Sequence, residues 1–209
     1  MKKLLYTFLA VSLIFSACEK EEEEPTNNSN NNNSGNTTNL AIGDYHQGGV
    51  IFYLSANGGG LICDVSDVAN SLNLVIWGCA GDSIGVQNST IGTGFSNTMK
   101  IINECNDVGI AAEICYNLTK LGYSDWYLPS EEELIEIYLN RVIINATSIS
   151  NGGYALTMID SDDGSEDTYW SSTEAPIPEE YAVGVRFSDG HSKGFGKSRN
   201  FNVRAVRAF

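Results

Sequence analysis

Apolar residues mark two strand-like segments between residues 50 and 65, after a long polar stretch. In YHQGGVIFYLSANGGGLICDV, the apolar runs at 50–54 and 61–65 are separated by a glycine-rich turn that tolerates positive φ. The pattern predicts a hairpin. A further short strand is expected around Trp77, and the glycine-rich stretch after it is typical of a loop.

The spacing of apolar residues then changes to that of helices. Met99, Ile102 and Cys105 recur at helical intervals, and so do the apolar residues of 111–121, which predicts two helices. A third helix is expected after DWYLP at 125–129. Here SEEEL fits a capping box, and the helix dipole favours carboxylates in a first turn by about 0.3–1 kcal/mol each. The three glutamates therefore indicate a helix start and need no catalytic role.

Strand-like segments dominate the rest of the chain. YALTM, TYWSST, YAVGVRF and FNVRAVRAF alternate with stretches rich in Gly, Asp, Ser and Pro. An order of hairpin, helices and strands predicts an α+β domain with a mainly antiparallel sheet and two to three helices in its first half. Residues 40–209 are numerous enough to form one such domain with its own core.

The N-terminus has the features of an export signal. Lys2 and Lys3 precede an apolar run that is too short to span a bilayer as a mature helix, which predicts a signal peptide at 1–17. The run ends in FSAC, which resembles the lipobox of bacterial lipoproteins and implies lipidation of Cys18. Ordinary signal cleavage remains the alternative.

Residues 18–39 are polar throughout. The acidic run EKEEEE and the Asn-rich tract behind it cannot bury enough apolar surface to fold, so they predict a disordered tether. The acidic run also resembles the export signal of Bacteroidota-type lipoproteins, which implies an outer-membrane location facing the cell exterior. The alternative is a solvated charge run. Membrane contact is expected through the lipid anchor only.

Charge and cysteine content narrow the function classes. Residues 40–209 hold 9 Lys and Arg against 21 Asp and Glu, which argues against nucleic acid as a partner. The acidic residues gather at 160–180 and the basic ones at 186–207, so these stretches either pair or face different partners. An even number of cysteines in an exported protein predicts two disulfides, in one of three pairings, among Cys63, Cys79, Cys105 and Cys115. Buried free thiols are the alternative.

Three stretches in fixed order carry a family resemblance: GYSDWYLPSEEEL, YWSSTE and VRFSDG with the terminal VRAVRAF. Together they are similar to the Lcl C-terminal domain family. The matching positions are Trp126, Leu128, Pro129, Ser130, Glu133, Leu134, Tyr169, Trp170, Ser171, Ser172, Arg204 and Arg207. The resemblance implies a C-type-lectin-like fold, and in the family's namesake the domain is implicated in adhesion to sulfated glycosaminoglycans.

Most of these family positions also have structural explanations. Trp126 and Trp170 lie in apolar surroundings and are expected in the core. Ser171 and Ser172 are expected to bond nearby backbone. Arg204 and Arg207 are expected to pair with the acidic segment at 160–180.

The sequence gives little support for a metal site or a catalytic site. The acidic loop containing Asp160, Asp162 and Asp163 suggests weak calcium ligands, but its glycine is misplaced for an EF-hand, and a solvated loop is the alternative. The two histidines are far apart and no C-x-x-C occurs, so no cofactor is expected. Formylglycine-generating enzymes, which share the fold class, use cysteines late in the domain, whereas every cysteine here precedes Tyr116. We therefore do not expect an enzyme. An enzyme of the formylglycine-generating type, or a hydrolase, is the third interpretation.

The remaining candidate is a basic, glycine-rich segment near the C-terminus. Its side chains suit a polyanion through charge-assisted hydrogen bonds, and they are Arg186, His191, Lys193, Lys197 and Arg199. A solvated hairpin is the alternative. The sequence thus predicts a lipid-anchored binding module for glycans or other extracellular polymers, or else an envelope lipoprotein that acts through protein partners.

Overall fold

The computed structural model describes residues 39–68, 75–158 and 167–209. Its compact unit is Asn39–Phe209. The predicted lipidation residue Cys18 and the weak calcium candidates Asp160, Asp162 and Asp163 lie outside the described residues. Within the described ranges, none of the helices has the length and apolarity needed to cross a bilayer.

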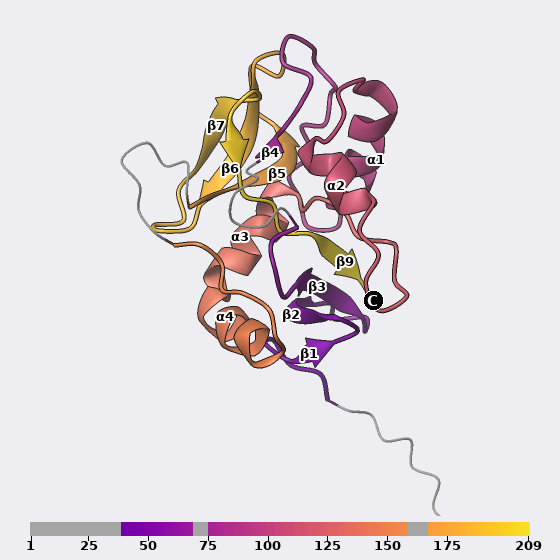
Figure 1. Cartoon of the computed structure of the whole chain (residues 1–209), viewed down its shortest axis with the longest axis vertical. Helices are drawn as coiled ribbons and strands as arrows, with labels where there is room; N and C mark the ends of the chain where they lie inside the picture. The colour runs from indigo at the N-terminus through magenta and orange to yellow at the C-terminus, as the bar shows by residue number, and fades with distance from the viewer. Residues whose placement is uncertain (1–38, 69–74, 159–166) are drawn as a thin grey trace, which may run out of the picture. The chain divides into compact units, whose positions relative to one another are not determined.

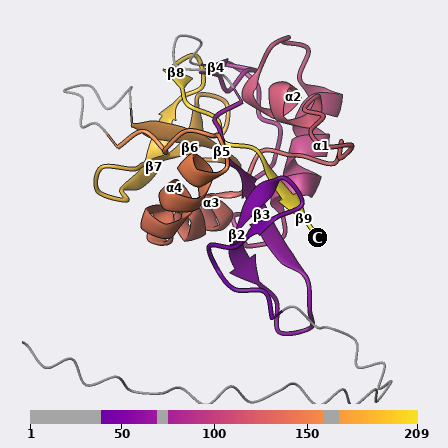
Figure 2. The ribbon, with the colours of Figure 1, turned by 60° about the horizontal axis from the view of Figure 1, so that its bottom comes forward.

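The strands form three small sheets in which every strand pair is antiparallel. The first sheet has the order β1 (Tyr45–His46), β2 (Gly49–Leu54), β3 (Gly60–Asp64) and β9 (Val206–Ala208). The second pairs β4 (Val75–Ile76) with β8 (Asn200–Phe201), and the third has the order β5 (Thr168–Glu174), β6 (Tyr181–Arg186) and β7 (Ser192–Gly196). Figure 2 shows β9 beside β3, so the last strand returns to the first hairpin.

Four helices lie in the described part of the chain: α1 (Gly94–Glu104), α2 (Ala111–Tyr116), α3 (Glu131–Leu139) and α4 (Arg141–Ser150). The predicted α+β class with antiparallel sheets is confirmed. The sequence analysis did not foresee α4. Its buried residues are Ile144, Asn145 and Ser148, so polar side chains occupy the inner face and conceal the usual apolar period.

The strand predicted for YALTM is wrong, because the described chain at 154–158 has no strand. The amide of Leu156 donates to the side-chain oxygen of Asn145, and the amide of Thr157 donates to the hydroxyl of Tyr169, each at 2.8 Å. Side chains therefore satisfy the amides that a neighbouring strand would otherwise pair with.

The first sheet is covered on both faces. Ile51 belongs to the core cluster that includes residues of α1 and α2, whereas Val50 and Phe52 belong to the cluster that includes residues of α3 and α4. Successive side chains of a strand point to opposite faces, so this division follows from the period of two. In Figure 1, α1 and α2 accordingly lie on one side of β3 and β9, and α3 and α4 on the other.

The capping box predicted for α3 is confirmed. The hydroxyl of Ser130 accepts from the amide of Glu133, and the Glu133 carboxylate accepts from the amide of Ser130. The same carboxylate accepts from the amide of Gly92 at 2.7 Å, so it also ties the loop before α1 to α3. Burial raises the pKa of Glu133. Its role is to fix a helix start and a loop.

Candidate binding site

A pocket of about 340 Å³ lies where three segments distant in sequence come together. These are the loop after β4, the start of β6 and the turn between β7 and β8. Its lining residues are Ala80, Gly81, Glu180, Tyr181, Gly196, Lys197, Ser198 and Arg199. Polar side chains, one aromatic ring and exposed backbone therefore converge on one concave surface.

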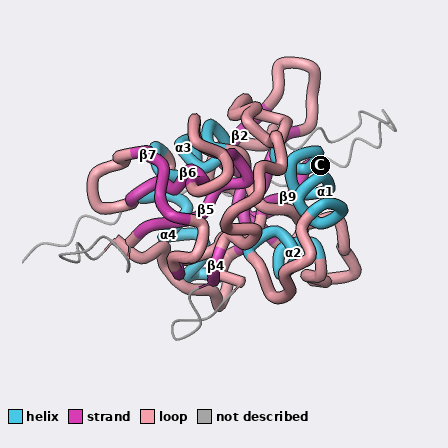
Figure 3. Tube along the Cα trace, turned by 90° about the horizontal axis from the view of Figure 1, so that it is seen from above, coloured by secondary structure: helices cyan, strands magenta, loops and turns pink. Residues whose placement is uncertain are grey.

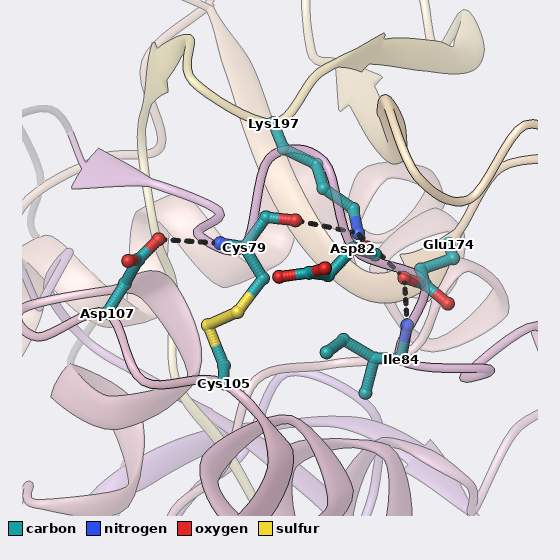
Figure 4. The surroundings of a disulfide bond; sticks show 7 residues. All are labelled: Cys79, Asp82, Ile84, Cys105, Asp107, Glu174 and Lys197. Atoms are coloured by element: carbon teal, nitrogen blue, oxygen red, sulfur yellow. Dashed lines mark hydrogen bonds and ion pairs between the residues drawn. A yellow bond between two sulfur atoms is a disulfide. The ribbon is translucent and has the colours of Figure 1, made fainter.

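Lys197 lies at this pocket, but its side chain points into the protein interior. The side chain is fully buried, and its ammonium group lies 2.7 Å from a carboxylate oxygen of Glu174. Figure 4 shows the ammonium group beside Glu174 and Asp82, and it donates to the carbonyl of Asp82 at 2.7 Å. It also lies 4.4 Å from the ring centroid of Trp77. The prediction that Lys197 contacts a ligand directly is therefore wrong, because its charge is turned inward.

Glu174 organises the loop that forms one wall. Its carboxylate accepts from the amides of Ile84 at 2.8 Å, Gly85 at 2.6 Å and Val86 at 3.1 Å, besides the contact with Lys197. No helix or strand is present between β4 and α1, and Figure 3 shows loop there. The buried Glu174 carboxylate and its four donors thus hold this loop, which has no β-sheet hydrogen bonds of its own in this part.

A disulfide between Cys79 and Cys105 fixes the same loop to the end of α1 (Figure 4). The carboxylate of Asp107 accepts from the amide of Cys79 at 2.7 Å and reinforces that link. Among the described residues, these three side chains are the only group of possible metal ligands close enough to share an ion. Their sulfurs are joined in the disulfide and offer no thiolate, so the cluster is structural.

The second predicted disulfide is wrong, since Cys63 and Cys115 are both free and buried. Cys63 on β3 lies in the core cluster shared with α3, whereas Cys115 on α2 lies in the other cluster. The two thiols therefore occupy opposite sides of the first sheet. Burial raises the pKa of Cys63 to about 12 and raises that of Cys115 as well.

Burial makes the two free thiols chemically inert. We expect iodoacetamide to leave Cys63 and Cys115 unmodified in the folded chain and to modify both after denaturation, because the reactive thiolate is scarce at such raised pKa values. Peptide mass spectrometry measures both states. As an internal control, Cys79 and Cys105 should become reactive only after reduction. A peptide pair linked through Cys63 and Cys115 would contradict the arrangement.

The remaining predicted ligand residues do not form one patch with the pocket. The Arg186 guanidinium pairs with Asp189, and together with the amide of His191 this lowers the pKa of Asp189 to about 2. Lys193 is exposed on β7 and lies 4.8 Å from the ring centroid of Phe195. Five residues of β7, at about 3.3 Å each, separate the Arg186 end from the pocket.

Arg199 is the predicted ligand residue that the structure places at the pocket with an exposed side chain. It lies in the turn between β7 and β8, immediately before β8, and its guanidinium carbon lies 6.0 Å from the ring centroid of Phe201. His191 is exposed as well, but it precedes β7 and does not line the pocket. The basic segment thus divides between the two ends of one edge strand.

The family positions serve the core. Trp126 and Trp170 are fully buried, as expected, and the indole of Trp170 donates to the carbonyl of Val75 at 2.8 Å. Ser171 donates through its hydroxyl to the carbonyl of Val183, and the amide of Ser172 donates to the carbonyl of Pro129. Leu128, Pro129, Leu134 and Tyr169 are also buried.

The two terminal arginines pair with aspartates other than the expected ones. Arg204 contacts Asp67 at 2.7 Å, and Arg207 contacts Asp125 at 2.5 Å, both outside the acidic segment at 160–180. The expectation that they pair with that segment is therefore wrong. The described part of the segment does meet the basic stretch, in the contact between Glu174 and Lys197.

Sequence reasoning missed the residue that organises the site. Glu174 is the last residue of β5, a strand whose residues are all buried, and it is itself only 3% exposed. A carboxylate at the end of a fully buried strand requires buried donors, and a lysine within a glycine-rich turn is one possible source. The need of a buried carboxylate for donors is the signal that the sequence offers. The donor amides at 84–86 lie far from Glu174 in the sequence, so no local pattern identifies them.

Comparison with known proteins gives a family but no characterised relative. The Lcl C-terminal domain matches residues 67–207, which is more than half of the chain. The matched range includes all residues that line the pocket. No curated protein matches the chain.

Proposed function

Because the chain belongs to the Lcl C-terminal domain family, we propose that it is a cell-surface binding module that recognises glycans or other extracellular polymers. The family assignment by itself names no ligand. Support for the proposal comes from the pocket between the loop after β4 and the turn between β7 and β8.

The lining of the pocket suits a saccharide. Arg199 supplies a planar set of donors, Glu180 supplies acceptors, and Tyr181 supplies an aromatic face with a hydroxyl. Sugar hydroxyls donate and accept alike, so a mixed lining of this kind matches them, and Arg199 adds charge-assisted bonds to acidic groups. This convergence of an aromatic residue with complementary polar groups is the observation that carries the proposal.

The support beneath the pocket favours binding further. The ion pair between Lys197 and Glu174 and the disulfide at Cys79 hold the loop in place before any ligand arrives. A wall that is already ordered loses little conformational entropy on binding, which increases affinity for a given set of contacts. Glycoside cleavage commonly uses a pair of carboxylates, and Glu180 is the one carboxylate among the residues that line the pocket, so we infer recognition and not bond cleavage.

The position of the pocket suits display. In Figure 1, β4, β6 and β7 lie at one end of the described unit and β1 at the other, where the described chain begins. We propose that lipidated Cys18 anchors the protein to the outer membrane and that residues 18–39 tether it. A flexible tether of 22 residues reaches about 25 Å on average. The pocket then lies at the end of the folded unit opposite the end at which the tether joins.

Substitution of Arg199 tests the proposed function. On a glycan array, Arg199→Ser in the full chain should weaken binding by about tenfold or more, because a charge-assisted hydrogen bond is worth about 1.5–3 kcal/mol. Binding should also fall as salt rises. Lys193→Ser is the matched control, since it removes an exposed positive charge from β7 and Lys193 does not line the pocket. Equal binding by the Arg199 variant and the unaltered chain would rule out the pocket as the site.

A further inference from the structure

The outward face of α4 is more apolar than its inward face. The residues Leu139, Val142, Ile143 and Ile149 are exposed, with Val142 at 76%, whereas the helix buries Ile144 together with polar Asn145 and Ser148. Ordinary surface helices show the reverse distribution. Exposed apolar residues that gather in one place mark an interaction surface more often than scattered ones do.

These residues form a continuous stripe. Within α4, positions 142, 146 and 149 recur at intervals of three or four, and 143 is one turn from 146, so these residues lie along one side of the helix. Leu139, the last residue of α3, extends the stripe. A hollow of about 280 Å³ follows the stripe and is lined by Leu139, Asn140, Val142, Ile143 and Ala146. We call Leu139, Val142, Ile143, Ala146 and Ile149 the apolar α4 face.

The charge around this face differs from that of the whole chain. The chain holds 26 Asp and Glu residues, yet none occurs from residue 139 to residue 158, where Arg141 is the single charged side chain. Asp44, an exposed acidic residue, lies at the edge of the face, where it lines a hollow together with Ala146. The apolar residues themselves carry no charge, so they can be covered at low desolvation cost while Asp44 stays in contact with water. The exposed aromatic residue Tyr154 follows the helix directly, at 74% exposure.

The apolar α4 face adjoins the start of the folded chain. The hydroxyl of Thr147 donates to the carbonyl of Gly43 at 2.7 Å. A Cβ atom at Gly43 would lie 2.2 Å from a side-chain carbon of Ile143, so the two segments are in direct contact. Ile42 and Tyr45, both exposed, extend the apolar surface beside them. Figure 1 shows α4 and β1 at neighbouring positions of the unit, and Tyr45 of β1 lines one hollow with Ala146 of α4.

We propose that the apolar α4 face lies on the surface of the lipid bilayer to which the protein is anchored. The inference rests on the proposed lipid anchor at Cys18. The tether joins the folded unit beside this face, and its 22 residues reach about 25 Å on average, so the face meets the bilayer at high effective concentration. Apolar residues flanked by tyrosines match the boundary between headgroups and acyl chains.

The orientation follows from the same contact. With α4 and β1 on the bilayer, the pocket beside Arg199 lies at the other end of the unit, as the arrangement of elements in Figure 1 shows. The face therefore does more than add affinity to the anchor. It holds the pocket outward, whereas a tether alone leaves the orientation free.

Tryptophan scanning tests the contact. The full chain carrying Val142→Trp is reconstituted into phosphatidylcholine vesicles whose lipids are brominated in the acyl chains. The added indole should lose most of its emission, since interfacial side chains reach about 5–10 Å into the boundary region. Val108→Trp is the matched control, because Val108 is similarly exposed, at 83%, but lies between α1 and α2. Its emission should be unaffected. The native indoles are buried and common to both variants.

Each alternative result has a distinct meaning. Vesicles that retain the chain while Val142→Trp stays as bright as Val108→Trp overturn the membrane-facing surface alone. A chain that does not float with the vesicles overturns the anchor and the face together. A shift of the Val142→Trp emission with protein concentration in detergent, without vesicles, assigns the face to a second copy and also overturns the proposal. Glycan binding tested through Arg199 is independent of all three results.

Discussion

Replacement of Glu174 by leucine is expected to lower the free energy of unfolding by about 3–5 kcal/mol, as breaking a buried ion pair commonly does. The loss has two sources. Lys197 remains as a buried cation without its carboxylate, and the amides of residues 84–86 lose their acceptor. Chemical denaturation followed by fluorescence of the buried tryptophans measures the change.

The opposite substitution separates these two sources. Lys197→Met should cost less than Glu174→Leu, about 1–3 kcal/mol, because the carboxylate keeps its backbone donors. Asp189→Ser breaks the exposed pair with Arg186 and serves as the control, with a cost below about 1 kcal/mol. If Glu174→Leu were no more destabilising than Asp189→Ser, the buried pair would not be what holds the loop.

Features written in consecutive residues were predictable from the sequence. Ser130 and Glu133 are three positions apart, and both halves of the capping box connect those two residues, so the start of α3 could be located in advance. The hairpin of β2 and β3 was equally local, since its apolar runs and glycine-rich turn are adjacent. The α+β class followed from the order of such elements.

The helix α4 shows where local patterns fail. Its inward residues include Asn145, whose side chain accepts from the amide of Leu156, so a polar residue is buried for a tertiary reason. Its outward residues include Val142 and Ile149, which are apolar. Reading the periodicity alone therefore assigns the wrong side to the core, or finds no helix at all.

The candidate site was less predictable than the fold. Composition identified the basic segment that contains Lys197 and Arg199, but it did not distinguish a lysine that is fully buried from an arginine that lines a pocket. The distinction depends on Glu174, which lies 23 positions before Lys197, and on amides about 90 positions before Glu174. Contacts at such separations are set by the assembled fold.

The number of cysteines likewise did not predict how they pair. The even number correctly indicated a disulfide, yet the pairing depends on which face of β3 carries Cys63. Its neighbour Ile62 lies in the cluster that contains Cys115, while Cys63 itself lies in the other. A difference of one position along a strand thus decides between a bridge and two free thiols.

Removal of the disulfide by the double substitution Cys79→Ser and Cys105→Ser should lower the free energy of unfolding by about 3.5 kcal/mol, from the chain entropy of a loop with 26 positions between its ends. Denaturant titration measures the loss. Reductant should lower the unfolding midpoint of the unaltered chain and leave the double variant unchanged, which provides the control. An unaltered chain that is insensitive to reductant under unfolding conditions would contradict the bridge.

Combining this change with Glu174→Leu tests whether one loop is held at both ends. The disulfide fixes the loop at Cys79, and the carboxylate fixes it at 84–86, only a few residues further on. Once either restraint is lost, the loop is partly released, so the other stabilises the fold less. The combined variant should therefore lose less stability than the sum of the separate losses, by about 0.5–3 kcal/mol, as coupled neighbours do. Strict additivity would mean that the two restraints act on independent parts of the structure.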